Sequence, residues 1–243
     1  MKFIDKIKEL GRINMHINKV QRNTYDTLAS LLLHRLFPDS TVLPFSPFSL
    51  NPNTILHIIN DLQVNRRNSV IEFGTGVSTL IMAKFIKSNG LTTQILSVDH
   101  DLKWSAYIEE ELIKHNCSEQ VTLLVAPLCE HNNDQYSGKW YNEIIVKNAM
   151  DQKTFDMLLV DGPSAGEHKH VRFSALPIIF EALEDNFIIF LDDIRRPGER
   201  KILEEWEGMF HNAKKDVIVN YDVNKVYAVI KSPGGFSTNP MSY

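Results

Sequence analysis

The sequence predicts an α/β fold, a doubly wound sheet of seven strands with the last strand antiparallel, preceded by an N-terminal helical extension. From residue 68 onward, short apolar runs alternate with segments of helical periodicity, which is typical of a mostly parallel sheet covered by helices. Several of these runs end on an acidic residue beside a turn. The final two runs are separated by residues 221–224 only, too few for a helical crossover, so we expect them to form an antiparallel hairpin.

Residues 1–66 form the predicted extension. Apolar residues recur at steps of three and four from Ile4 to Val20 and continue through Leu28 to Leu32, which predicts a helix broken near Gly11. Three prolines between residues 38 and 47 then end helical structure, and a second helix follows to about residue 62. The favoured interpretation is a cap packed over the domain at 67–243. The alternatives are an arm that forms a homo-oligomer and a substrate lid.

The remaining elements follow in order along residues 67–243. Strands are expected near 69–73, 94–98, 121–126, 156–161, 187–192, 216–220 and 225–231. Helices are expected near 78–88, 102–116, 170–183 and 198–211.

Composition excludes several classes of function. A net charge of −4 and an isoelectric point near 6.1 give no basic field for nucleic acid. Two cysteines, Cys117 and Cys129, suit a reducing compartment and form no metal-ligand pattern. The sequence has no apolar stretch of the roughly 20 residues that span a bilayer, and its start lacks the apolar run of a signal peptide. We therefore expect a cytoplasmic protein without a membrane span.

A glycine turn follows the first strand. Glu72 ends the apolar run, Gly74 and Gly76 follow it, and Asp99 ends the next strand. Glycines let the backbone approach a ligand at the start of a helix, and an acid at the tip of the second strand can accept both hydroxyls of a ribose. A nicotinamide-binding fingerprint is the rival interpretation, but it requires a third glycine where this chain has Thr79.

These residues resemble motif I and the post-strand acid of class I S-adenosylmethionine-dependent methyltransferases, whose Rossmann-like sheet also ends in one reversed strand. The resemblance implies S-adenosylmethionine as cofactor. The positions that it assigns to cofactor binding are Glu72, Gly74, Thr75, Gly76, Ser78, Asp99, His100 and Asp161.

Three further acids, Asp161, Asp192 and Asp193, follow the strands near 156–161 and 187–192. Carboxylates at neighbouring strand ends repel one another unless they share a cation or a proton, and oxygen ligands favour Mg²⁺, Ca²⁺ or Mn²⁺. The segment resembles the metal-dependent catechol-type O-methyltransferases, which implies that these three acids bind Mg²⁺. This chain departs from that family at two positions. The family has an amide at the position of Asp193 and a lysine base at the position of Ser164.

A closer resemblance is to methyltransferases of bacterial surface-polysaccharide and small-molecule gene clusters, and it covers residues 68 to about 231. The matching features are Asp161 to Pro163, Arg172, Ala175 to Pro177, Asp192 to Arg196, Glu199 and Trp206. This resemblance implies O-methylation of a sugar, a glycoconjugate or a small-molecule hydroxyl in polysaccharide biosynthesis.

Three residues are candidates for the catalytic base that accepts the hydroxyl proton: Asp161, His168 and His170. Histidine is well placed to take a proton at neutral pH, and a carboxylate at a strand end is held rigidly. Arg172 and Arg196 are expected to bind an anionic substrate group or to neutralise the acidic edge, with salt bridges to Asp192 or Asp193 as the structural alternative.

The predicted function is therefore an S-adenosylmethionine-dependent methyltransferase acting on a small-molecule or glycan acceptor. The polar stretch from Leu128 to Tyr141 is long for a plain connection and is predicted to form an acceptor-binding lid. A nicotinamide-dependent oxidoreductase and a non-catalytic cofactor-binding protein remain the alternatives.

Overall fold

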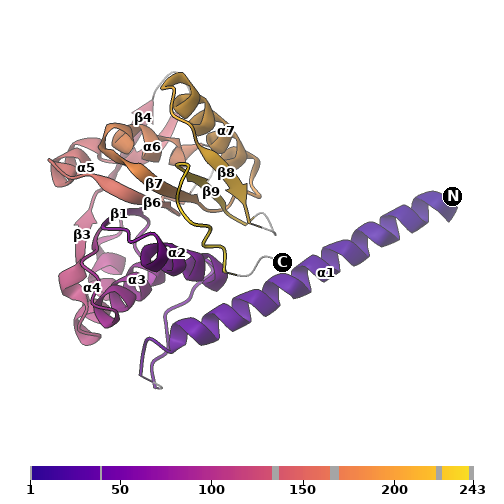
Figure 1. Cartoon of the computed structure of the whole chain (residues 1–243), viewed down its shortest axis with the longest axis horizontal. Coiled ribbons are helices and arrows are strands. Elements are labelled where there is room, and N and C mark those ends of the chain that lie inside the picture. The colour runs from indigo at the N-terminus through magenta and orange to yellow at the C-terminus, as the bar shows by residue number, and fades with distance from the viewer. Residues whose placement is uncertain (1, 39, 133–136, 165–169, 223–225, 241–243) are drawn as a thin grey trace.

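A seven-stranded sheet forms the centre of the computed structural model, which describes residues 2–38, 40–132, 137–164, 170–222 and 226–240 (Figure 1). The strands lie in the order β3-β2-β1-β6-β7-β9-β8. Their bounds are β1 Ser69–Phe73, β2 Gln94–Asp99, β3 Val121–Val125, β6 Phe155–Val160, β7 Leu183–Leu191, β8 Ile218–Tyr221 and β9 Ala228–Lys231. Neighbours from β3 to β7 are parallel, whereas β9 runs antiparallel to both β7 and β8. The predicted sheet with a reversed last strand is confirmed.

Helices cover both faces of this sheet, so two hydrophobic cores form. Alternate residues of β1 divide between them: Val70 packs in one core, and Ile71 and Phe73 in the other. The first core is closed by α2 Pro52–Val64, α3 Val77–Ser88 and α4 Leu102–Lys114, and the second by α5 Glu143–Met150, α6 Ala175–Ile179 and α7 Pro197–Asn212 (Figure 1). All of β6 is buried, as a central parallel strand requires.

Two segments within residues 67–243 differ from the sequence predictions. Residues 128–141 contain a two-stranded antiparallel sheet, β4 Leu128–Asn132 and β5 Ser137–Tyr141, and α5 follows it because the Asn142 side chain accepts hydrogen bonds from the amides of Ile144 and Ile145. The helix expected at 170–183 is wrong as one element. It is divided into the 3₁₀ turn η2 Val171–Ser174, the short helix α6 and the 3₁₀ turn η3 Phe180–Ala182, and β7 already begins at Leu183. Pro177 lacks an amide donor and fits only the first turn of α6.

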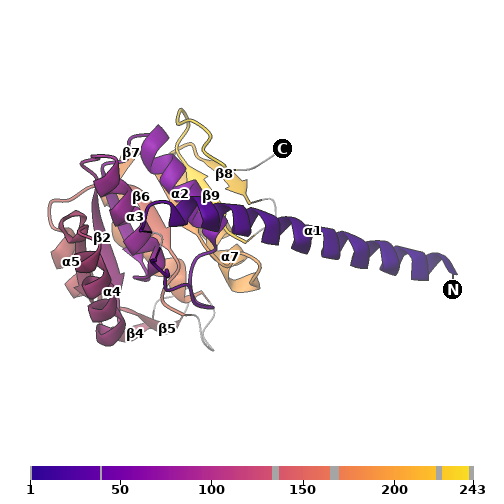
Figure 2. The ribbon, with the colours of Figure 1, turned by 90° about the horizontal axis from the view of Figure 1, so that it is seen from below.

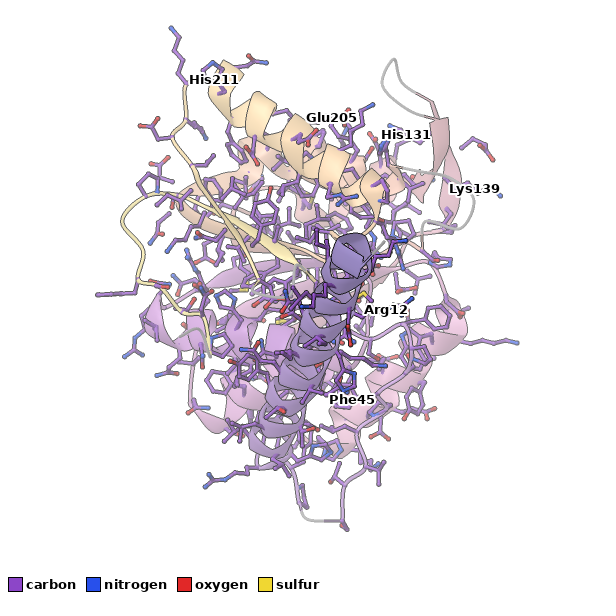
Figure 3. All side chains as sticks on the ribbon, turned by 90° about the vertical axis from the view of Figure 1, so that its right-hand side faces the viewer. Arg12, Phe45, His131, Lys139, Glu205 and His211 are labelled. Carbon is purple, nitrogen blue, oxygen red and sulfur yellow. The ribbon has the colours of Figure 1, made fainter. Side chains whose placement is uncertain are left out.

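Helix α1, Lys2–His34, continues without a break through Gly11, so the expected interruption there is wrong. Its N-terminal half projects away from the rest of the molecule (Figures 1 and 2), and Figure 3 looks along it from that end, with Arg12 labelled. Every residue from 6 to 20 is exposed, whereas Ala29 and Leu33 are buried. The favoured interpretation as a cap therefore does not describe residues 6–20. Among the described helices, none is both long enough and apolar enough to cross a membrane.

Candidate functional site

The acids singled out in the sequence meet at one edge of the sheet. Glu72 lies on β1, Asp99 ends β2, Asp161 follows β6, and Asp192 and Asp193 follow β7. Because β1 pairs with both β2 and β6, and β6 pairs with β7, the carboxyl ends of these four strands are neighbours. Ligands of open parallel sheets bind beyond this edge.

The glycine turn after β1 is built around a close backbone contact. Gly74 has φ +108°, and a Cβ added there would lie 2.8 Å from the amide nitrogen of Gly162, which follows β6. Position 74 therefore requires glycine for two reasons: its φ is positive, and Gly162 leaves no room for a Cβ. A Cβ on Gly76 would meet no described heavy atom within 4 Å, so the protein itself does not require glycine there. The open space at Gly76, at the start of α3, is what a ligand approaching the backbone needs.

Glu72 lies beneath this turn and is 1% exposed. Its carboxylate accepts hydrogen bonds from the hydroxyls of Ser78 (2.5 Å), Thr79 (2.5 Å) and Ser97 (2.8 Å). Burial raises the pKa of Glu72 to about 7, although these hydroxyls act in the opposite direction. Thr79 also accepts a hydrogen bond from the amide of Gly76 (3.0 Å), which gives a structural role to the residue that replaces the third glycine of the nicotinamide fingerprint.

Asp99 connects the tip of β2 to the same turn. One carboxylate oxygen accepts from the amide of Thr75 (3.1 Å), and the other accepts from the amides of His100 (2.7 Å) and Asp101 (2.9 Å). The Trp104 indole donates to the Thr75 carbonyl (2.7 Å) and so holds the turn from the other side. Thr75, Asp99 and His100 are thus brought together as the sequence predicts, with His100 Nδ1 3.3 Å from an Asp99 oxygen.

The second group of acids forms a cluster. One carboxylate oxygen from each of Asp161, Asp192 and Asp193 lies within 4.8 Å of the others. Burial raises the pKa of Asp161 and, more strongly, that of Asp192, and the neighbouring negative charges raise the pKa of Asp192 further. Asp192 Oδ1 is buried and has no hydrogen-bond partner among the described residues. An oxygen-only set with an unpaired buried oxygen fits a hard divalent cation.

Two arginines already compensate part of this charge. Arg172, 3% exposed, lies 3.2 Å from Asp193 Oδ2 and 3.5 Å from Asp161 Oδ1, and it also donates to the Asp161 carbonyl. Arg196 lies 2.7 Å from the same Asp193 oxygen, and its side chain is half-exposed. The structure therefore gives the salt bridges that were the alternative for both arginines. Binding of an anionic substrate group stays a prediction, and Arg196 is the more accessible of the two.

The structure describes one of the two candidate histidine bases, His170. His170 is half-buried, adopts the left-handed conformation (φ +68°) and begins the η2 turn. His168 lies outside the described residues. Their role as proton acceptors therefore stays a prediction.

Tyr141, at the end of β5, is a residue that sequence reasoning assigned only to a lid. It is 1% exposed, its ring stacks on Phe73 with centroids 5.7 Å apart, and its hydroxyl has no hydrogen-bond partner among the described residues. A Cβ on Gly162 would clash with this hydroxyl, so Tyr141 reaches the contact between Gly162 and Gly74. Burial raises the pKa of Tyr141 well above its usual value, so the phenol remains a donor. No strand signal in residues 137–141 indicated this position.

A polar pocket lies at the same edge of the sheet. It is lined by Arg22, Tyr25, Asp26, Asn51, Asn53, Thr54, Asp222, Val226 and Tyr227, of which only Val226 lacks a polar side-chain group. The Val226 carbonyl accepts a hydrogen bond from the amide of Ile194 (3.0 Å), so the pocket adjoins the loop that carries Asp192 and Asp193. The Asn53 Oδ1 atom is buried and has no partner among the described residues.

Comparison with known families gives one match that covers just over half of the chain. The model of a methyltransferase domain matches residues 71–194, from β1 to the loop after β7. The matched segment contains the glycine turn, Asp99 and the whole acidic cluster. No curated protein sequence matches the chain.

Solved structures share the fold at low sequence identity. A putative caffeoyl-CoA O-methyltransferase from Staphylococcus aureus has a TM-score of 0.57 at 13% identity, covering 88% of this chain and 99% of that one. The SAH-bound methyltransferase PaMTH1 from Podospora anserina has a TM-score of 0.57 at 16% identity (86% and 88%). An O-methyltransferase from Bacillus cereus in complex with SAH has a TM-score of 0.52 at 13% identity (86% and 89%).

Proposed function

The chain belongs to the family of methyltransferase domains, and on that premise we propose that it transfers the methyl group of S-adenosylmethionine to a hydroxyl oxygen. The main observation in support of this proposal is the arrangement of the glycine turn. Gly74 packs on Gly162, Gly76 leaves space at the start of α3, and Asp99 lies beside the turn. The Bacillus cereus O-methyltransferase, which shares the fold and was solved in complex with SAH, supports this choice of cofactor.

Methyl transfer from a sulfonium is an in-line displacement in which the acceptor oxygen forms a bond to the methyl carbon as the sulfur–carbon bond breaks. The protein therefore has to align the two reactants, exclude water and accept the hydroxyl proton. We assign alignment of the cofactor to the turn and to Asp99, and the hydroxyl of Tyr141 is a further donor toward that site. We assign the proton to Asp161, with His168 and His170 as the alternatives. Asp161 is the most rigidly held of the described candidates, because its amide donates to the Phe73 carbonyl of β1 (3.0 Å).

We propose that the acceptor is polyhydroxylated, such as a sugar or glycoconjugate of polysaccharide biosynthesis, rather than an apolar aromatic. The pocket next to the acidic cluster supports this, because eight of its nine lining residues carry hydrogen-bonding side chains. The amide and carboxylate groups of this pocket can form hydrogen bonds with an acceptor that has several hydroxyls, whereas an apolar aromatic acceptor would leave these groups without hydrogen bonds. A small hydroxylated molecule of comparable polarity is the alternative acceptor.

A divalent cation such as Mg²⁺ fits the acidic cluster and belongs to the same proposal. Asp161, Asp192 and Asp193 would hold it, and the buried, unpaired Asp192 Oδ1 is the atom that most needs such a partner. When bound, the cation would supply positive charge for the acceptor oxygen. Arg172 and Arg196 already pair with Asp193, so they fix the orientation of that carboxylate.

We further propose that the reaction takes place in the cytoplasm. Cys117 and Cys129 are both free, and Cys129 is exposed, which suits a reducing compartment.

Two measurements test the proposed function. Isothermal titration calorimetry with S-adenosylhomocysteine and with NAD should show binding of the first and none of the second. The reverse result would favour the nicotinamide-dependent alternative. A methyl-release assay with hydroxylated acceptors then separates an enzyme from a non-catalytic cofactor-binding protein. The same assay in excess chelator tests the cation, since full turnover without added metal would exclude a metal-dependent reaction.

A further inference from the structure

Helix α1 has two different faces. Where its C-terminal half meets the rest of the molecule, Asp26, Ala29 and Leu33 point inward, and Ala29 and Leu33 are buried. On the opposite face Leu28 and Leu31 are exposed, Leu31 at 63%. This second, exposed apolar face of α1 therefore does not dock the helix on its own domain.

Exposed apolar residues continue on this face from Leu28 back to Ile7, along the part of α1 that projects from the rest of the molecule in Figures 1 and 2. We call this face the outer stripe. Its exposed apolar members are Ile7, Leu10, Ile13, Ile17, Val20, Leu28 and Leu31. A helix that leaves the domain gains little stability from intrinsic propensity alone, so an apolar stripe of this length indicates a partner surface.

The spacing along the outer stripe is that of a coiled coil. Taking Ile7 as heptad position a, positions a and d are Ile7, Leu10, Asn14, Ile17, Gln21, Thr24, Leu28 and Leu31, with strictly alternating steps of three and four. The polar member nearest the middle of the projecting part is Asn14, at an a position. A single Asn at position a favours a parallel, two-stranded coiled coil, because its amide pairs with the same residue of the other helix.

The positions that flank the seam carry no charge between residues 7 and 31. The e positions are Gly11, Asn18 and Tyr25. The g positions are Ile13, Val20 and Thr27. Charged residues of this segment, such as Lys8, Arg12 and Lys19, occupy b, c or f positions and point away from the seam. Two identical helices can therefore approach along the outer stripe without repulsion between like charges.

We infer that the outer stripe of α1 binds the same stripe of a second copy of this chain, as a parallel two-stranded coiled coil with the two Asn14 side chains paired. A lipid surface is the main competitor, because the opposite face of α1 is basic at Lys8, Arg12 and Lys19. A membrane would leave the Asn14 side chain in an apolar layer without a partner, whereas a second copy supplies that partner.

The oligomeric state of the full chain tests the inference. Sedimentation equilibrium should give twice the monomer mass of 27.9 kDa at micromolar concentration. Ile17→Lys, within the stripe, should weaken self-association by at least about tenfold, because it buries a charge in the seam. Met15→Lys is the matched control: Met15 is more exposed than Ile17 but lies at a b position, so its substitution should leave the dimer intact.

Register is tested by a disulfide. Asn14→Cys in a Cys129→Ser background should form a covalent dimer under mild oxidation with oxidised glutathione, because a positions face one another in a parallel pair. Arg12→Cys in the same background should not, since f positions are far apart. Cross-linking at neither position in a stable dimer would contradict the parallel, in-register arrangement.

Two outcomes would overturn the inference. One is a monomer at concentrations of tens of micromolar. The other is a monomer that binds vesicles of phosphatidylglycerol and phosphatidylcholine and loses this binding in Ile17→Lys, which would identify a lipid surface as the partner. Calorimetric binding of S-adenosylhomocysteine, measured on the same samples, shows that the domain is folded and reports separately on the proposed function.

Discussion

Replacement of Glu72 by Gln should change how the stability of the protein depends on pH. The carboxyl group is 1% exposed and lies among the hydroxyls of Ser78, Thr79 and Ser97. These hydroxyls stabilise the ionised form, but burial outweighs them and raises the pKa of Glu72 from 4.5 to about 7. The folded protein therefore holds this proton more tightly than the unfolded chain does.

The sign and size of the effect follow from linkage. Below pH 4.5 the group is protonated in both states and contributes no difference. Between pH 4.5 and 7 the unfolded chain ionises while the folded protein stays protonated, so the free energy of unfolding falls as the pH rises. A rise in pKa from 4.5 to about 7 corresponds to a loss of about 3 kcal/mol, at about 1.4 kcal/mol per pKa unit. Glu72→Gln cannot ionise and should lack this loss.

Urea unfolding followed by tryptophan fluorescence at pH 5 and pH 8, without cofactor, measures the effect. The difference in unfolding free energy between Glu72→Gln and the parent should shift in favour of the variant by about 2 to 3 kcal/mol over this range. Other titrating groups are common to both proteins and cancel in the difference. Glu110→Gln, on the exposed side of α4, is the control and should follow the parent.

Parallel profiles of Glu72→Gln and the parent would refute the reasoning. They would mean that Glu72 is already ionised in the folded protein at pH 5 and that the three hydroxyls, not burial, decide its state.

Three further predictions concern the same edge of the sheet. Gly74→Ala should destabilise the fold by at least about 1 to 3 kcal/mol in urea unfolding, because φ +108° is strained for alanine, whereas Gly76→Ala should leave stability nearly unchanged and weaken cofactor binding. Asp99→Ala should weaken S-adenosylhomocysteine binding in calorimetry by roughly 1 to 3 kcal/mol, and unchanged affinity would remove Asp99 from the cofactor site. Asp161→Ala should lower turnover by about 10²- to 10⁴-fold with cofactor affinity nearly intact; turnover within about threefold of the parent would exclude Asp161 as the proton acceptor.

Features that depend on short stretches of sequence could be predicted. The run from Ser69 to Phe73 followed by Gly74 gives a strand and a turn through local residue preferences alone. Parallel pairing then brings the carboxyl ends of the strands to a common edge of the sheet. The residue that ends or follows each strand therefore predicts that Asp99 lies beside the turn and that the acids of the cluster lie together. The reversed last strand followed from the length of one connection.

Features that depend on contacts between distant segments could not be predicted. Residues 128–141 pair as a hairpin although their sequence is polar, and only this pairing brings Tyr141 to Gly162. The ion pairs of Arg172 depend on how η2 lies against the ends of β6 and β7. The apolar period of α1 predicted a helix correctly, but a period alone does not say whether an apolar face meets the same chain or another one.

The position of α1 connects the proposed acceptor pocket with the inferred dimer. Arg22, Tyr25 and Asp26 of α1 line the pocket, and Asp26 accepts a hydrogen bond from the amide of Asn53 (3.3 Å), which also lines it. One turn away on the same helix, Leu28 belongs to the outer stripe. A coiled coil along that stripe would restrain the helix that lines the pocket, so less of the binding free energy of an acceptor would be lost in ordering that helix. We therefore expect self-association to strengthen acceptor binding and to leave cofactor binding at the glycine turn unchanged.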